Sequence, residues 1–164
     1  MTLKELLLEA EETLRASGAD YPLDDARLLL EGALLIPEKE LKDHINEEID
    51  HEKKELVLSY VKRRAEGEPL QYITGYWEFF SRRFFVGKGV LIPRDDTEVV
   101  LRASIDFLRK SGKESPSVLD ICSGSGILSI TLKKLFPKQG CLLSRFQRTL
   151  FSISKRTQST TRRI

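Results

Sequence analysis

Residues 118 to 130 read VLDICSGSGILSI, in which a compact apolar run, a glycine and serine segment and a second apolar run follow one another. The first run has the length and residue types of a buried strand, and the second begins a new apolar period. Two glycines between the runs allow the backbone to reverse direction within a few residues. The segment therefore predicts the strand, turn and helix of an α/β unit.

The residue types in this turn are those of a ligand site. Gly124 and Gly126 let a ligand lie close to the backbone, while Ser123 and Ser125 add hydroxyl groups without bulk. Asp120 can accept a hydrogen bond from a ligand or fix the loop, and the amides at the start of the following helix face whatever is bound. Any strand-to-helix turn can use such a segment, so the turn alone leaves cofactor binding open. A dinucleotide fingerprint fits poorly because its third glycine is missing.

The first 67 residues predict a small helical bundle. Thr2 and Glu5 have the spacing of a capping box, and apolar residues then recur at helical spacing as far as Gly18. A second helix starts at Pro22, a short one covers Glu38 to Ile45, and a fourth runs from about Asp50 to Ala65. The side chains expected to face inward are Leu3, Leu6, Leu7, Ala10, Leu14, Ala26, Leu29, Leu30, Ala33, Leu34, Leu56, Val57, Tyr60 and Val61.

Aromatic and β-branched residues dominate residues 69 to 93, which predict two short strands turning at Ser81 to Arg83. The aromatic side chains could form a stacking platform for nucleic acid, but basic residues do not alternate with them, so we expect them to pack a core. A helix follows Pro93, with Asp95 and Glu98 as its capping box. Its apolar residues are Val99, Val100, Ala103, Ile105 and Leu108.

Composition excludes several classes of protein. No apolar run approaches the roughly 20 residues that cross a bilayer, and the first residues lack the features of a signal peptide. Cys122 and Cys141 have no metal-binding spacing, and His44 and His51 lie in a charged segment without clustered ligands. We therefore expect a cytoplasmic monomer with reduced thiols and with no metal, no membrane contact and no direct contact to nucleic acid.

Residues 68 to 100, read together with the turn segment, resemble the release factor glutamine methyltransferase family, of the HemK or PrmC type. Members carry a hairpin linker of the form PxxYxxGxxxF, a segment close to VLIPRPxTE and a cofactor motif close to DLGTGSG. Each has a counterpart here, in the same order. The resemblance covers residues 1 to about 137.

The resemblance implies a mixed fold of α+β and α/β character. Residues 1–67 correspond to an N-terminal helical bundle, 68–93 to a β-hairpin linker, and 94–137 to the first, incomplete part of a Rossmann-like class I methyltransferase domain. Residues 138–164 fit none of these parts.

The family transfers a methyl group from S-adenosylmethionine to the glutamine side-chain amide in the GGQ motif of peptide-chain release factors. The resemblance thus implies S-adenosylmethionine as cofactor and release factors as partners. Three positions depart from the family pattern, because Cys122 and Ser81 stand where it has glycine and Asp95 where it has proline. The cofactor-binding residues carried over are Asp120, Cys122, Ser123, Gly124, Ser125 and Gly126.

Two functional elements of the family do not occur in the 164 residues. There is no NPPY motif, which orients the amide for methylation, and no acidic residue after Asp120. We assign no catalytic residue. Residues 1–137 hold 20 basic and 25 acidic residues, whereas residues 138–164 hold seven basic residues, eight Ser or Thr and no acid. We interpret this tail as out-of-frame or disordered, and a basic arm for RNA or membranes is the alternative.

The strand at residues 118–122 would then lack both neighbours, so we expect residues 94–164 to form no stable methyltransferase domain. On this interpretation the chain is a truncated, inactive copy of a family enzyme with little or no cofactor affinity. One alternative is a non-enzymatic module whose helical domain and hairpin bind a release factor or another protein. Another is an adenine-type nucleic-acid methyltransferase, which the helical N-terminus and the VLIPR segment disfavour.

Overall fold

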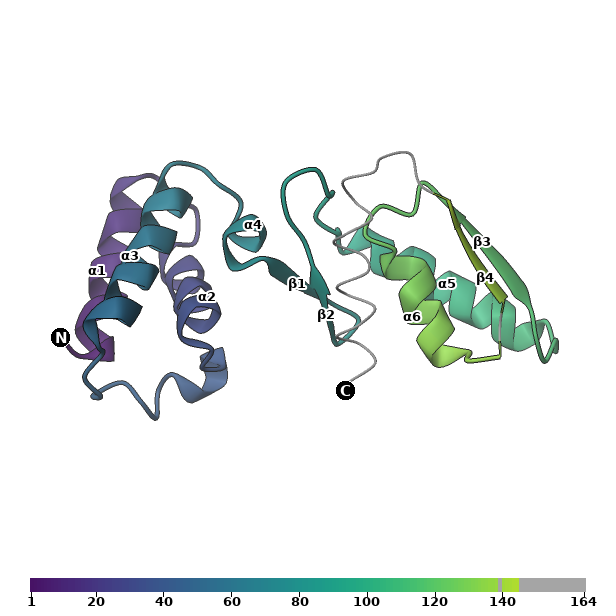
Figure 1. The fold of residues 1–164 in the computed structure, drawn as a ribbon, viewed down its shortest axis with the longest axis horizontal. Helices are drawn as coiled ribbons and strands as arrows, with labels where there is room; N and C mark the ends of the chain where they lie inside the picture. Colours follow the sequence, from purple (N-terminus) through teal and green to yellow (C-terminus); the bar gives the residue numbers. More distant parts are fainter. Residues whose placement is uncertain (139, 145–164) are drawn as a thin grey trace. The chain divides into compact units, whose positions relative to one another are not determined.

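A computed structural model of the chain describes residues 1 to 138 and 140 to 144 (Figure 1). The chain divides into two units, Met1–Thr74 and a second that begins at Gly75. The first unit is entirely helical, and the second contains a hairpin and an α/β segment.

The first unit consists of helices α1 (Leu3–Ala16), α2 (Pro22–Leu34), α3 (His51–Ala65) and α4 (Leu70–Thr74), with one 3-10 turn, η1 (Glu38–Glu40). α1, α2 and α3 all contact one another, and α4 contacts both α2 and α3. Short helices of this kind gain their stability from the apolar face that they bury against their neighbours.

Local sequence signals fix where these helices begin. The predicted capping box is confirmed, because the Thr2 hydroxyl accepts a hydrogen bond from the Glu5 amide while the Glu5 carboxylate accepts one from the Thr2 amide. Asp50 caps α3 through its carboxylate, which accepts from the Lys53 amide at 2.8 Å. Pro22 occupies the first turn of α2, where its missing N–H is not needed.

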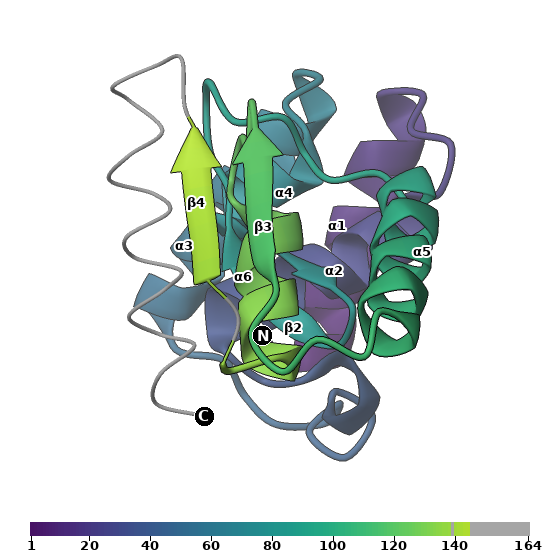
Figure 2. The same ribbon diagram turned by 90° about the vertical axis from the view of Figure 1, so that its right-hand side faces the viewer.

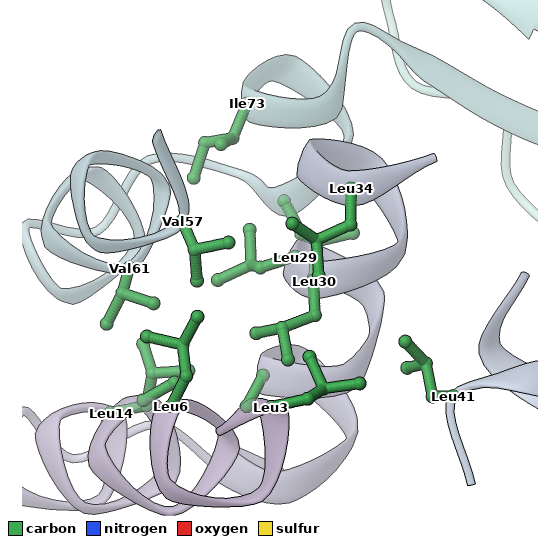
Figure 3. Close-up of a cluster of buried hydrophobic side chains, with 13 residues drawn as sticks. Leu3, Leu6, Leu14, Leu29, Leu30, Leu34, Leu41, Val57, Val61 and Ile73 are labelled. Carbon is green, nitrogen blue, oxygen red and sulfur yellow. The ribbon is translucent and has the colours of Figure 1, made fainter. Parts of the chain in front are cut away.

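The core of the helical unit is made of leucine and valine side chains from α1, α2 and α3 (Figure 3). Most of the predicted inward residues are buried there, but Leu56 is exposed. Ile73 of α4 points into the same core. The buried residues are Leu3, Leu6, Ala10, Leu14, Ala26, Leu29, Leu30, Leu34, Leu41, Val57, Val61, Leu70 and Ile73.

Two segments of the helical unit differ from the prediction. The expected helix from Glu38 to Ile45 is wrong: only η1 forms, and turns follow it, with Leu41 anchoring the segment in the core. The resemblance places residues 68–75 in the hairpin linker. In the structure, α4 forms within them because Leu70 and Ile73 are buried on one helical face.

The second unit opens with the predicted hairpin, formed by β1 (Tyr76–Phe79) and β2 (Arg82–Phe85). Phe79 pairs with Arg82, so the turn consists of Phe80 and Ser81, whereas the sequence predicts a turn at Ser81 to Arg83. Both turn residues have positive φ, 51° and 57°, as a two-residue type I′ turn requires.

Aromatic packing within the hairpin confirms the prediction of a core role. Phe79 and Phe84 are buried, and their rings meet edge to face with centroids 6.2 Å apart. They join a cluster with Leu101, Ile105, Leu108, Ile127, Ile130 and Leu132.

Helix α5 (Asp96–Lys110) supplies Leu101, Ile105 and Leu108 to this cluster. Val99 and Val100 are apolar too, but both are exposed. The predicted capping box at Asp95 is also absent. The Glu98 carboxylate instead accepts from the Phe80 amide at 3.2 Å and from Arg102 at 3.1 Å, and so joins α5 to the hairpin turn.

The α/β segment comprises β3 (Ser117–Ile121), α6 (Ile127–Leu135) and β4 (Gly140–Ser144). β3 and β4 run parallel in register from Ser117 opposite Gly140 to Ile121 opposite Ser144, and α6 lies behind the pair in Figure 2. The expectation that the strand at 118–122 lacks both neighbours is therefore wrong. The start of the basic tail supplies one neighbour, and residues 145–164 lie outside the described residues.

Candidate functional site

The predicted strand, turn and helix are confirmed in the second unit, where the chain leaves β3 at Ile121 and enters α6 at Ile127. The candidate residues Asp120 and Cys122 to Gly126 thus form one short loop at the carboxyl end of β3. In open α/β sheets this end of the strands is where ligands bind.

Alternate residues of the loop are left-handed. Cys122, Gly124 and Gly126 have φ of 61°, 54° and 78°, so two of the three positions carry the residue that this conformation favours. A Cβ placed on Gly124 would meet only the Cys122 carbonyl oxygen, 4.0 Å away, so the space beside Gly124 is open to a ligand. Cys122 is the one L-residue among the three, and it is exposed.

Asp120 both fixes the loop and offers an acceptor. Its Oδ2 accepts a 2.8 Å hydrogen bond from Ser129 of α6, whose hydroxyl also lies 3.2 Å from the Gly126 carbonyl oxygen. No described residue donates to Oδ1. The sequence does not predict this role of Ser129, because a serine nine residues after an aspartate carries no signal that the two side chains form a hydrogen bond.

Some polar groups in the loop have no hydrogen-bond partner among the residues that the structure describes. Ser125 is only 5% exposed, yet within the described part of the chain its hydroxyl has no hydrogen bond. The first helical bond of α6 runs from the Ile130 amide to the Gly126 carbonyl oxygen. The Ile127 and Leu128 amides precede it and find no acceptor in residues 1–138 or 140–144. The first amides of any helix lack an acceptor within the helix, so these two amides and the Ser125 hydroxyl are open to a polar ligand or to water.

Other kinds of site receive no support in the described residues. No group of histidine, cysteine and carboxylate side chains could hold a metal there. No helix in the same residues is both long and apolar enough to cross a bilayer. A surface hollow of about 430 Å³ lies at the hairpin turn, lined by Phe80, Ser81, Arg82, Glu98, Arg102 and Leu135, and none of the loop residues contributes to it.

A family model described as the PrmC N-terminal domain matches residues 5–75. This range covers the helical unit, including α4, and ends where the hairpin begins. The match therefore extends beyond residue 67, where the sequence alone suggested that the helical part ends.

Curated relatives match most of the chain. A release factor glutamine methyltransferase of Bifidobacterium longum is 37% identical over 143 residues, which cover 84% of this chain and 48% of the relative. One of Moorella thermoacetica is 38% identical over 138 residues, again 84% of this chain and 48% of the relative. One of Fusobacterium nucleatum is 38% identical over 122 residues, 74% of this chain and 34% of the relative.

Each match is longer than the first unit, so each includes part of the second unit. The chain spans about half the length of the Bifidobacterium and Moorella relatives. In sequence, the chain is similar to release factor glutamine methyltransferases over most of its length, and its helical unit matches the PrmC N-terminal domain.

Proposed function

We propose that the loop from Asp120 to Gly126 is one wall of an S-adenosylmethionine site. We further propose that this site serves methylation of the glutamine side-chain amide in the GGQ motif of peptide-chain release factors. The observation that carries the first proposal is the group of unpartnered polar atoms in the loop, namely the buried Ser125 hydroxyl and the two free amides.

The chemistry of the loop fits this cofactor. S-adenosylmethionine has hydroxyl and ammonium groups that donate hydrogen bonds and a carboxylate that accepts them. Asp120 Oδ1 is the acceptor in the loop, and the Ile127 and Leu128 amides are donors at the positive end of a helix. Gly124 leaves space against which a flat or extended ligand can lie. When bound, the cofactor supplies an electrophilic methyl group.

The residues that would present a glutamine to this methyl group are not among the 164. An amide nitrogen is a poor nucleophile because its lone pair is delocalised into the carbonyl group, so the amide must be held in an orientation that favours attack. The family uses NPPY for this step, and the sequence contains no NPPY. We therefore propose that the polypeptide of this sequence holds a partial cofactor site and does not transfer the methyl group by itself.

Amide chemical shifts during titration with S-adenosylmethionine test the cofactor proposal. An affinity near 1 mM, about −4 kcal/mol, gives little heat in calorimetry yet moves the resonances of contacting amides. We expect shifts confined to residues 120 to 128, which Asp120→Asn weakens. Asp106→Asn, an exposed aspartate on α5, is the matched control and should change nothing. Shifts spread over the helical unit, or none near the loop, would contradict the proposal.

A second candidate function is supported by the helical unit. Its 13 core residues lie within Met1–Thr74, so the unit has a complete core of its own. In this second proposal, the helical unit binds a release factor and the chain catalyses no reaction. Titration of a purified release factor with the full chain tests this, and binding that survives Gly124→Val but is lost when the helical unit is deleted would favour it. Binding lost with Gly124→Val would count against it.

A further inference from the structure

Two surface hollows meet at the hairpin turn of the second unit. The larger, of about 430 Å³, and a second of about 260 Å³ share Phe80 of the turn, Arg102 of α5 and Leu135 of α6 in their lining. Leu135 is the last residue of α6, whereas the loop with the proposed cofactor site precedes the first residue of this helix. A helix of nine residues is about 13 Å long, so the hollows and the loop are separate sites.

The floor of the hollows is apolar and held in place. Ile105, which lines the smaller hollow, is buried in the hydrophobic cluster, and Phe80 packs against the same cluster. Leu135 adds an apolar side chain that is 37% exposed. The Arg102 guanidinium lies 5.4 Å from the centre of the Phe80 ring and donates to the Glu98 carboxylate at 3.1 Å. The floor can therefore receive an apolar side chain beside a guanidinium whose position is fixed.

Two more arginines line the hollows, and their charges are not paired. Arg82 of β2 lines the larger hollow and Arg109 of α5 the smaller one. Among the described residues neither guanidinium has a hydrogen bond or an ion pair, although Arg82 is half-buried. A guanidinium is a planar fork of N–H donors that matches the two oxygens of a carboxylate. The hollows thus offer two free forks on either side of an apolar floor.

The mixture of charges favours an acidic peptide over a nucleic acid. Glu98 and Asp106 also line the hollows, so two carboxylates stand among the three arginines. Binding to a phosphate backbone depends on several cations that neutralise successive phosphates, and these two carboxylates would repel it. A peptide carries separate carboxylates with an apolar side chain between them. Its backbone amides can also donate hydrogen bonds to Asp106.

We propose that the two hollows at the hairpin turn are a docking site for an acidic peptide segment of another protein. An apolar side chain of the segment lies against Phe80 and Leu135, and carboxylates on either side of it bind Arg82 and Arg109. The site depends on the packing of the hairpin against α5 and α6. It does not depend on cofactor binding at the loop or on methyl transfer.

Titration of the full 164-residue chain with the end-blocked peptide Glu-Asp-Leu-Glu-Asp, followed by amide resonances, tests the proposal. We expect a Kd on the order of 100 μM at low salt. The shifts should lie at residues 80 to 82, 102 to 109 and 135, and not at residues 120 to 128. The peptides Gln-Asn-Leu-Gln-Asn and Glu-Asp-Ser-Glu-Asp lack the charges and the apolar side chain, respectively. Each should bind at least about 10-fold more weakly.

Three double variants separate specific docking from general attraction between charges. Arg82→Gln, Arg109→Gln should raise the Kd at least about 10-fold. Arg82→Lys, Arg109→Lys keeps both charges without the planar forks and should raise it about 3-fold. Arg94→Gln, Lys113→Gln is the matched control, because it removes two exposed charges of the same unit outside the hollows. It should change the Kd by less than about 2-fold.

Amide resonances of the hydrophobic cluster show whether each variant is folded, so a loss of binding by a folded variant reports on the hollows alone. Absence of binding by the unchanged chain overturns the proposal. Equal losses in the glutamine variant of the hollows and in the matched control overturn it too, as does a lysine variant that binds like the unchanged chain. Tighter binding of an oligouridylate than of the peptide, with shifts at the same residues, would assign the hollows to nucleic acid instead.

Discussion

The carboxylate of Asp120 at the end of β3 accepts a 2.8 Å hydrogen bond from the hydroxyl of Ser129 in the first turns of α6. The two residues are joined by the loop that carries the candidate site. Their bond closes the loop across its ends, and no described residue donates a hydrogen bond to Oδ1 of Asp120. The loop is therefore held in shape by the same side chain that offers an acceptor to a ligand.

Ser129→Ala should destabilise the second unit by about 1–2 kcal/mol, because it removes a bond to a charged group and leaves a half-buried carboxylate without its partner. Urea unfolding followed by amide resonances of α6 measures this. Ser104→Ala is the control, since that hydroxyl bonds only to the Val100 carbonyl oxygen on an exposed helix face, and it should change stability by less than about 0.5 kcal/mol. Equal effects of the two variants would show that the bond to Asp120 contributes nothing.

Cys122→Gly should stabilise the second unit by about 1 kcal/mol. An L-residue in the left-handed region costs about 1–2 kcal/mol, and part of this gain is offset by the greater freedom of glycine in the unfolded chain. Cys122→Ala keeps a Cβ at the same φ and should have little effect. Thermal unfolding of the three proteins distinguishes the two substitutions, and a glycine variant less stable than the alanine variant would contradict the assignment of strain.

Features set by neighbouring residues could be predicted from the sequence. The Thr2 and Glu5 box, the Asp50 region as a helix start, and the strand and helix around the loop each depend on residues within a few positions of one another. Such signals are local, so tertiary packing does not need to be known.

Features decided by packing could not be predicted from the sequence. α5 has two apolar sets at helical spacing, one with Leu101, Ile105 and Leu108 and one with Val100, Ala103 and Phe107, and periodicity alone does not say which is inward. The segment Leu70–Thr74 has strand-forming side chains, and it becomes a helix because its apolar residues complete a helical core.

The parts of the candidate site followed the same division. The loop residues were identified from one contiguous segment, whereas Ser129 and the unpartnered state of the Ser125 hydroxyl depend on how α6 lies against β3. The sequence does not predict the strand β4, because its pairing with β3 is a contact across more than 20 positions.

Glu98→Ala should loosen the hairpin turn without unfolding α5. The carboxylate accepts from the Phe80 amide and from Arg102, whose guanidinium lies 5.4 Å from the centre of the Phe80 ring. Without it, the Phe80 amide should exchange with solvent roughly 5-fold faster, since one bond of about 1 kcal/mol is lost. Asp106→Ala removes an exposed carboxylate from the same helix and should leave this amide unchanged. Unchanged exchange in both variants would show that Glu98 does not hold the turn.

The helical unit should lose stability in acid through its two capping carboxylates. The Thr2 amide lowers the pKa of Glu5, and the Lys53 amide lowers the pKa of Asp50. A group with a lowered folded pKa stabilises the fold above its unfolded value, about 4, and this contribution is lost as the pH falls through the folded pKa. Urea midpoints should therefore drop between about pH 5 and about pH 2.

Two double variants test this prediction. The variant Glu5→Gln, Asp50→Asn keeps the hydrogen-bond acceptors but cannot titrate, so its urea midpoint should fall less steeply with falling pH. The variant Glu12→Gln, Glu55→Gln changes exposed positions and should follow the unchanged chain. Equal slopes for both pairs would mean that the caps do not govern the acid response.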